Sequence, residues 1–398
     1  MPSWLTPRVH LTPEQIKAVE LDPGKHRVIF GAPGSGKTMI LLYRARYLID
    51  NFGVKPERFR IVVFTNVLKQ YIRSALEFLQ LPEGSVSTFD SLCSEYYRTK
   101  INQKLPWDEE NKQPDFSAIT ENVLKLATKE KQYNRPFDFI LVDEGQDLDL
   151  QAYNTLTALS QHVSVFMDHK QQVYDRGSSQ KKILESLGKK RISFSLLNAF
   201  RCSSNIVMLA SRFISDDDER TSFISQSNQS TSDEKPEVYV ADGFEDEKAR
   251  LIEVVRERQM KGDRIAILLP QKRQVFGFAK GLREAGLEVE IPEQIKGRSD
   301  FAPLDFTTNI PKLMPYPSAK GITFDSVLMP RLSSASFGKM PIDKLQRLIF
   351  VGITRATKWV YMSGDGGRLP IFKILAELEE EKQIVINRCN TSPGLFDL

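Results

Sequence analysis

Cysteine is scarce in this chain, with three in 398 residues, and histidine occurs only four times. Cys93, Cys202 and Cys389 lie far apart, and their number is odd. A disulfide scaffold needs several pairs, and a structural zinc site needs cysteine or histidine at short, regular spacings. Neither pattern is present, so we expect three reduced, unpaired thiols.

Long apolar runs, a signal peptide and internal repeats are also lacking. A membrane-spanning helix needs about 20 apolar residues, and the chain begins with Met1-Pro2-Ser3-Trp4, which has neither the basic nor the apolar region of a signal peptide. We therefore expect a cytoplasmic protein without membrane contact. With 41% hydrophobic and 27% charged residues the composition is that of a soluble chain, long enough for about two or three domains. The net charge of +4 permits a nucleic-acid partner without arguing for one.

A phosphate-binding loop stands near the start of the chain. The segment GAPGSGKT, residues 31–38, follows a short apolar run and precedes apolar residues at helical spacing. In this setting the pattern G-x-x-x-x-G-K-[ST] turns backbone N–H groups and a helix N-terminus toward an anion. The candidate nucleotide-binding residues of the loop are Gly31, Ala32, Gly34, Ser35, Gly36, Lys37 and Thr38. Lys37 is expected at the β- and γ-phosphates, and Thr38 is expected to bind Mg²⁺.

A pair of acids follows a second apolar strand. The apolar residues 137–142 are followed directly by Asp143-Glu144-Gly145-Gln146-Asp147. Carboxylate oxygens are the ligands that Mg²⁺ prefers, and a second carboxylate can polarise a water molecule. We therefore expect Asp143 to bind Mg²⁺ and Glu144 to act as the general base for hydrolysis.

Three further features leave two interpretations open. Thr12, Pro13 and Gln15 form a helix capping box, yet the Gln15 amide can also pair with an adenine edge. Thr65 and Asn66 end a predicted strand over residues 60–66, where α/β proteins gather ligands. Phe89 lies beside hydroxyls at the end of another short strand, and it either contacts nucleic acid or simply ends that strand.

The order of these segments resembles that of the UvrD/Rep-type helicases of superfamily 1. The shared order is a glutamine-bearing capping box, GAPGSGKT, a strand ending in Thr-Asn, DEGQD, and a strand followed by Asp168, Gln171 and Tyr174. Three later segments are similar to family motifs: LNAFRCS (197–203) to L-x-x-N-Y-R-S, PSAKGITF (317–324) to H-S-A-K-G-L-E-F, and VGITRA (351–356) to Y-V-A-x-T-R-A. The resemblance covers residues 11 to about 364.

The resemblance implies an α/β fold of two RecA-like P-loop domains with an ATP cleft between them. We expect an N-terminal domain over residues 1–188, with a small, mostly helical insert over 93–136, and a C-terminal domain over 189–398. In the second half, strands are expected over 192–196, 237–240, 265–269 and 287–291, and helices over 204–213, 245–259 and 273–284. The segment 215–235 is expected to be a surface loop because it is rich in Ser and Asp. The two insertions of the larger family members are small or missing here.

The resemblance also implies roles for individual residues. Gln15 would read adenine and Gln171 would sense the γ-phosphate, while Arg201 and Arg355 would neutralise charge in the transition state. Contacts to single-stranded nucleic acid are implied for Thr65, Asn66, Phe89, Tyr174 and Ser318. Two departures weaken some of these contacts: Pro317 and Thr323 replace the family's His and Glu.

The function implied is an ATP- and Mg²⁺-dependent translocase or helicase on single-stranded DNA, with 3′ to 5′ polarity, in repair, replication or defence. RNA is an alternative substrate. A second class of function is a regulatory ATPase that is triggered by nucleic acid and signals to a partner nuclease or toxin. The C-terminal segment 392–398 is loosely similar to sliding-clamp-binding peptides, although a frayed terminus explains it more simply.

Overall fold

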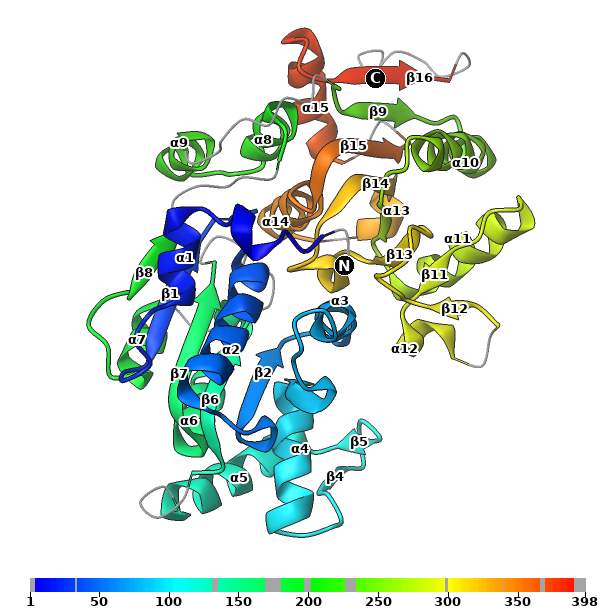
Figure 1. The fold of residues 1–398 in the computed structure, drawn as a ribbon. Helices are drawn as coiled ribbons and strands as arrows, with labels where there is room; N and C mark the ends of the chain where they lie inside the picture. The colour runs from blue at the N-terminus through cyan, green and yellow to red at the C-terminus, as the bar shows by residue number, and fades with distance from the viewer. Residues whose placement is uncertain are drawn as a thin grey trace. The chain divides into compact units, whose positions relative to one another are not determined.

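The structure is a computed structural model that describes residues 4–32, 34–130, 135–168, 180–196, 202–225, 234–297, 300–338, 340–365 and 369–389. The chain divides into two compact units, Met1–Leu197 and Asn198–Leu398. Each unit is a parallel β-sheet flanked by helices, the α/β class expected from the sequence (Figure 1). No helix within the described ranges is long and apolar enough to cross a membrane. All three cysteines are described, and none forms a disulfide.

The first unit has a six-stranded parallel sheet in the order β3-β2-β6-β7-β1-β8. Its strands are β1 (Arg27–Gly31), β2 (Phe59–Val63), β3 (Val86–Thr88), β6 (Phe137–Val142), β7 (Ser160–Met167) and β8 (Phe194–Leu196). Its helices are α1 (Pro13–Val19), α2 (Lys37–Phe52), α3 (Asn66–Leu76), α4 (Phe89–Lys100), α5 (Phe116–Glu130), α6 (Leu150–Leu159) and α7 (Gln180–Ser186). The insert expected over 93–136 consists of the end of α4, a small hairpin of β4 (Trp107–Asp108) and β5 (Gln113–Pro114), and α5.

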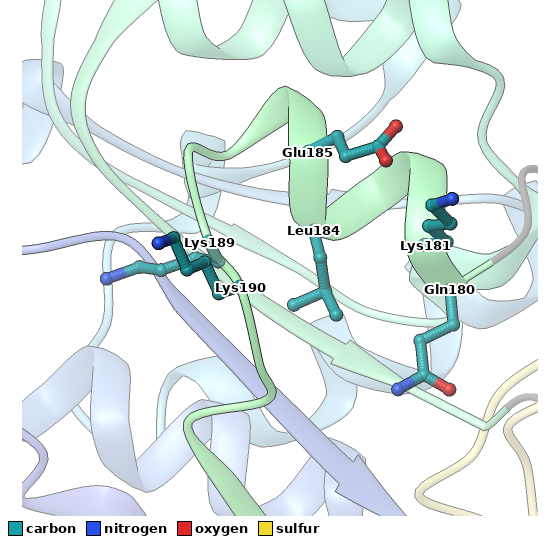
Figure 2. Close-up of a pocket in the computed structure, with 6 residues that line it drawn as sticks. All are labelled: Gln180, Lys181, Leu184, Glu185, Lys189 and Lys190. Carbon is teal, nitrogen blue, oxygen red and sulfur yellow. The ribbon is translucent and has the colours of Figure 1, made fainter.

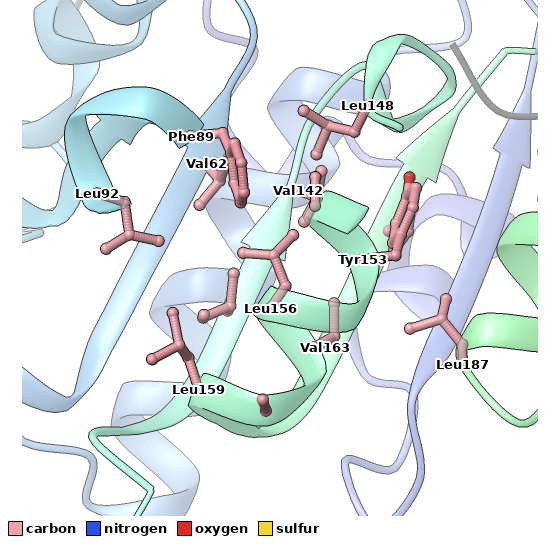
Figure 3. Packing of buried hydrophobic residues seen from close by; sticks show 14 of the residues in the cluster. Val62, Phe89, Leu92, Val142, Leu148, Tyr153, Leu156, Leu159, Val163 and Leu187 are labelled. Atoms are coloured by element: carbon pink, nitrogen blue, oxygen red, sulfur yellow. The ribbon is translucent and has the colours of Figure 1, made fainter. Parts of the chain in front are cut away.

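Alternating strand residues build the core of this unit. Val28 and Phe30 of β1 face a cluster formed with α4, α5, α6 and α7, whereas Ile29 lies between them and does not join it. Figure 3 shows part of this cluster, in which Leu156 and Leu159 of α6 pack toward Val142 and Val163 of the sheet. The strands are buried on both faces, which is the reason they read as continuous apolar runs in the sequence.

The second unit has an eight-stranded parallel sheet in the order β12-β11-β13-β10-β14-β15-β9-β16. Its strands are β9 (Glu237–Val240), β10 (Ile265–Leu269), β11 (Glu290–Ile291), β12 (Ala302–Pro303), β13 (Lys312–Pro315), β14 (Phe324–Leu332), β15 (Ala356–Gly364) and β16 (Val385–Arg388). Its helices are α8 (Ser204–Ser211), α9 (Asp217–Ser225), α10 (Phe244–Met260), α11 (Lys272–Glu284), α12 (Glu293–Lys296), α13 (Ser334–Phe337), α14 (Ile342–Ile353) and α15 (Ile371–Glu380).

The structure corrects the placement of one strand. The strand expected over 192–196 in the second domain is β8, and it pairs with β1 in the sheet of the first unit. The Ser193 N–H donates to the Val28 carbonyl at 2.8 Å, which joins the segment to β1. A local apolar pattern identifies a strand but not the strand that it pairs with, so the sequence placed this one in the wrong sheet.

Two further expectations about local structure are wrong. Residues 217–225 form α9 instead of a loop: acidic residues in its first turn stabilise the helix N-terminus, and Phe223 packs on Phe350 with ring centroids 5.4 Å apart. Phe89 does not end a strand. It begins α4, because the Thr88 side chain accepts a hydrogen bond from the Ser91 N–H as the helix N-cap.

Candidate functional site

The phosphate loop connects β1 to α2, and its conformation favours glycine at three positions. A Cβ at Gly31 would lie 2.4 Å from Ser35 Oγ, and Gly34 and Gly36 adopt φ of 78° and 85°. L-residues with side chains rarely adopt such φ values. The Ser35 hydroxyl is buried without a hydrogen-bond partner among the described residues. The loop is therefore a close-fitting cradle that holds an unsatisfied polar group, as expected for a site that receives an anion.

The Lys37 ammonium is held inside this cradle. Its Nζ donates to the carbonyls of Gly31 at 2.7 Å and Ala32 at 3.0 Å. A third contact, at 3.7 Å, is to the carboxylate of Asp168, which directly follows β7. The side chain of Lys37 is only 7% exposed, so its charge lies at the carboxyl edge of the sheet, in position for a phosphate.

The acid pair lies against the loop. Thr38 Oγ1 donates to Asp143 Oδ2 at 2.7 Å, and the Asp143 N–H donates to the Val62 carbonyl of β2 at 2.9 Å. Burial and the neighbouring Glu144 raise the pKa of Asp143 to about 7, against the lowering effects of the Thr38 hydrogen bond and of Lys37. A hydroxyl and a carboxylate that converge in this way form a donor set suited to Mg²⁺.

Glu144 adopts a strained backbone conformation. Its φ is +51°, and its side chain is 4% exposed. A residue other than glycine in this region costs of order 1–3 kcal/mol, and such strain concentrates at functional sites. The Gln146 amide holds the carboxylate: Nε2 donates to Glu144 Oε2 at 2.5 Å, and Oε1 accepts the Asp168 N–H at 3.0 Å.

Gly145 lets the acid loop close on the sheet. A Cβ there would lie 2.3 Å from Val165 Cγ1 and 2.6 Å from the Tyr153 hydroxyl, which itself donates to the Gly145 carbonyl at 2.6 Å. No individual role was expected from the sequence for Gln146, Tyr153 or Asp168, although Gln146 and Asp168 lie in segments that resemble the family's. The available signal for Asp168 was its place directly after an apolar strand, as with Asp143.

Gln15 forms the capping box expected from the sequence and makes one further contact. Its Oε1 accepts the Thr12 N–H at 3.0 Å, and its N–H donates to Thr12 Oγ1 at 3.2 Å, so the capping box is present. Its Nε2 also donates to the Ser35 carbonyl at 3.3 Å. Gln15 thus ties α1 to the phosphate loop; a contact to adenine stays a prediction.

The remaining candidates are distributed as follows. Arg355 is 4% exposed, and in the second unit it donates to the Val351 carbonyl at 3.0 Å and to Thr354 Oγ1 at 3.1 Å. Ser318 is half-buried in a 3₁₀ turn, Tyr316–Ala319. Gln171, Tyr174, Arg201 and the C-terminal segment 392–398 lie outside the described residues.

A pocket of about 770 Å³ lies beside the acid loop, at the carboxyl ends of β2, β3 and β6. Phe89 lines it but is only 9% exposed and belongs to the hydrophobic core. Three carboxylates also line the pocket: Asp90, Asp147 and Asp149. Thr65 and Asn66 directly follow the lining residues Val63 and Phe64 in the chain. The Thr65 hydroxyl caps α3 by accepting the Leu68 N–H, and Asn66 is exposed.

A phosphate loop and an acid pair on one edge of a parallel sheet define a P-loop nucleotide-binding protein. The family model of the UvrD/REP helicase N-terminal domain matches residues 11–131 and 107–191, and the model of the UvrD-like helicase C-terminal domain matches residues 194–297. The chain belongs to the UvrD/Rep-type helicases of superfamily 1.

Individual relatives match a short stretch. The chain is 37% identical over 92 residues to the ATP-dependent DNA helicase Rep of Buchnera aphidicola, which is 22% of this chain and 14% of that protein. It is 36% identical over 87 residues to the ATP-dependent DNA helicase PcrA of Staphylococcus epidermidis, 21% of this chain and 12% of the relative. A crystal structure of the C-terminal domain of a possible DNA helicase from Lactobacillus plantarum has a TM-score of 0.36 at 16% identity, covering 48% of this chain and 99% of that one.

Proposed function

We propose that this protein hydrolyses ATP to move along single-stranded DNA, as a translocase or helicase of the UvrD type with 3′ to 5′ polarity. The observation that carries the proposal is the hydrogen bond between Thr38 and Asp143, which joins the phosphate loop to the acid pair. The same site brings together a buried ammonium and a strained, buried glutamate. A loop that only connects a strand to a helix does not require this combination of residues.

The residues present fit ATP with Mg²⁺. The backbone of the cradle and the unsatisfied Ser35 hydroxyl would bind the phosphates, Lys37 would neutralise their charge, and Thr38 and Asp143 would hold Mg²⁺. When bound, the metal supplies a positive charge that stabilises the phosphate oxygens. Gln15 would contact the adenine, using the amide that now caps α1.

Glu144 would act as the general base that orients the attacking water, with Gln146 fixing its carboxylate. We also assign neutralisation of transition-state charge to Arg201 and Arg355 and sensing of the γ-phosphate to Gln171. Arginines in comparable roles contribute about 10³–10⁵ in kcat.

For the nucleic acid, the proposal assigns contacts to Thr65, Asn66, Phe89, Tyr174 and Ser318. Binding dominated by backbone charge and a few stacked bases is insensitive to sequence and weakens steeply with salt. The proposed role is in cytoplasmic DNA repair, replication or defence, with RNA as an alternative strand.

A second candidate function is a regulatory ATPase that signals to a partner nuclease or accessory protein. One observation favours it: three carboxylates line the pocket at the carboxyl ends of β2, β3 and β6, where they repel a phosphate backbone. Phe89, the aromatic candidate for base stacking there, lines this pocket with only 9% of its surface exposed and otherwise packs in the core.

The test compares ATP turnover of the full chain with and without single-stranded DNA. The expected result is stimulation by DNA in the wild type, loss of nucleotide binding in Lys37→Ala, and retained ATP binding without turnover in Glu144→Gln. Translocation is then measured as the displacement of a protein block from a labelled strand. Turnover that no nucleic acid stimulates would refute the translocase and favour the signalling ATPase. Equal loss of ATP binding in both variants would contradict the separate roles of Lys37 and Glu144.

A further inference from the structure

Basic side chains gather at the amino-terminal ends of two strands of the first sheet, opposite the carboxyl ends where the phosphate loop lies. Lys25 precedes β1 and Arg27 begins it, while Lys189, Lys190 and Arg191 precede β8. We call these five residues the basic edge. β1 and β8 are parallel neighbours, and the Val28 N–H donates to Ser193 Oγ at 3.0 Å, so the two basic segments run side by side. The phosphate loop follows the other end of β1.

The turn after α7 positions the two lysines. Gly188 adopts φ +64°, and the Lys189 N–H donates to the Leu184 carbonyl at 2.8 Å, which turns the chain back beside the helix. In Figure 2, Lys189 and Lys190 extend to the same side, away from the Glu185 carboxylate. A hollow of about 610 Å³ lies here, lined by Gln180, Lys181, Leu184, Glu185, Lys189 and Lys190.

These positive charges are poorly compensated. Arg27 pairs with Asp22 at 2.9 Å, but Lys25, Lys189, Lys190 and Arg191 have no ion pair with any residue that the structure describes. Partial burial lowers the pKa of Lys189, and the charges of Arg27 and Lys25 lower it further, which places these cations close enough to repel one another.

A further positive charge, the Arg44 guanidinium, is buried in the same unit. The Arg44 side chain is fully buried, and its guanidinium donates to Ser164 Oγ and to the carbonyls of Val19 and Leu21, none of which carries a negative charge. Burial and the charges of Arg44, His26 and Arg27 lower the pKa of His162 to about 3, so this histidine stays neutral. A cluster of cations with so few carboxylate partners costs folding free energy through like-charge repulsion, and an anionic partner relieves that cost.

We propose that the basic edge binds the phosphate backbone of duplex DNA, as a second DNA contact apart from the nucleotide site. A row of lysines suits a polymer with a charge every few ångströms along its axis. The residues of the basic edge and of the hollow include no aromatic ring, whereas sites for single strands use aromatic rings to stack bases. A duplex hides its bases and presents phosphates, which matches a surface with charge and no stacking platform. The inference rests on the proposed function only in taking DNA as the partner.

The experiment compares Lys25→Glu/Lys190→Glu with the wild type in binding a fluorescent blunt-ended duplex over a range of salt concentrations. Both lysines are exposed, so the fold is retained. Each phosphate contact contributes about 0.9 to the slope of log K against log salt, so the variant is expected to lose about 2 from the slope and to bind about tenfold more weakly at low salt. Lys25→Arg/Lys190→Arg restores binding. The matched control, Lys272→Glu/Lys280→Glu, makes the same charge change on the exposed side of α11 and leaves duplex binding unchanged.

An unchanged slope in the variant, or equal losses in the variant and the control, would overturn the proposal. Loss of binding to a polyglutamate peptide with duplex binding intact would also overturn it, because the basic edge would then serve an acidic protein segment. ATP turnover stimulated by single-stranded DNA is measured in parallel and should be unchanged in the variant. Absence of stimulation in the wild type would count against the translocase, whereas the difference in duplex binding still decides the role of the basic edge.

Discussion

Replacing Asp143 with asparagine should stabilise the metal-free protein above neutral pH. Asp143 is buried beside Glu144, and this environment raises its pKa to about 7 from an ordinary value of 3.8. The amide of the Asp143→Asn variant would keep an oxygen that accepts the Thr38 hydroxyl, and the substitution would remove the ionisation. The other oxygen, Oδ1, accepts the Glu144 N–H at 3.1 Å, and the amide NH₂ that replaces it cannot accept this bond. That loss does not depend on pH, so the change of the stability difference with pH reports the cost of burying a second carboxylate in the absence of a metal.

The magnitude follows from linkage between proton binding and folding. A carboxyl group whose pKa is raised in the folded state takes up a proton on folding, so its contribution to stability is complete below pH 4 and is lost as the pH rises to about 7. A shift of this size corresponds to about 4 kcal/mol at most. Asp143→Asn has no ionisable group at this position and does not show this pH-dependent loss of stability. The difference in the free energy of unfolding between variant and wild type should therefore grow from pH 4 to pH 7 and then level off.

The assay is thermal or urea unfolding in EDTA at several pH values between 5 and 8. For a unit of this size, 1 kcal/mol moves Tm by about 2–4 °C, so the difference at pH 8 is measurable. Asp138→Asn is the matched control on the same strand. Its carboxylate pairs with Arg58 at 2.6 Å near the surface, so removing its charge should cost about 0–1 kcal/mol, with the opposite sign.

A stability difference between Asp143→Asn and the wild type that does not grow from pH 5 to pH 8 in EDTA would refute the reasoning. It would mean that Asp143 is ionised in the metal-free protein and paired strongly enough with Lys37 to offset burial. Adding Mg²⁺ and ATP should reverse the order of stability, because only the wild type offers the metal a full carboxylate. Failure of the ligands to stabilise the wild type more than the variant would remove Asp143 from the metal site.

Three other variants test the remaining geometry. Gly145→Ala should lower stability by about 1–3 kcal/mol and reduce ATP turnover, because the new Cβ would meet Val165 at 2.3 Å; unfolding and ATPase measurements on the same preparation check both. Arg355→Ala should lower kcat at least about tenfold at saturating ATP, as should Arg201→Ala, and wild-type turnover would exclude the residue from catalysis. Lys312→Met should lower the urea midpoint by the equivalent of about 3–5 kcal/mol, because it leaves Glu290, its buried partner at 2.8 Å, without a counter-charge; an unchanged midpoint would show that the pair is dispensable.

The sequence by itself predicted the candidate nucleotide site, because its parts are short and contiguous. The glycines of residues 31–36 require a cradle, Lys37 and Thr38 start the helix that follows, and Asp143 and Glu144 directly follow a buried strand. The sequence also predicted the capping box of Thr12 and Gln15, which the structure confirms. Each of these features depends on backbone geometry within a few residues, which local residue types specify.

Tertiary structure decided which distant segments meet. The sequence could not show that β8 pairs with β1, that Asp168 lies 3.7 Å from Lys37, or that Phe89 turns into the core. The basic edge likewise exists only because β1 and β8 are neighbours, which brings Lys25 beside residues 189–191. These arrangements depend on strand pairing and burial between segments far apart in the chain, where local patterns carry no information about partners.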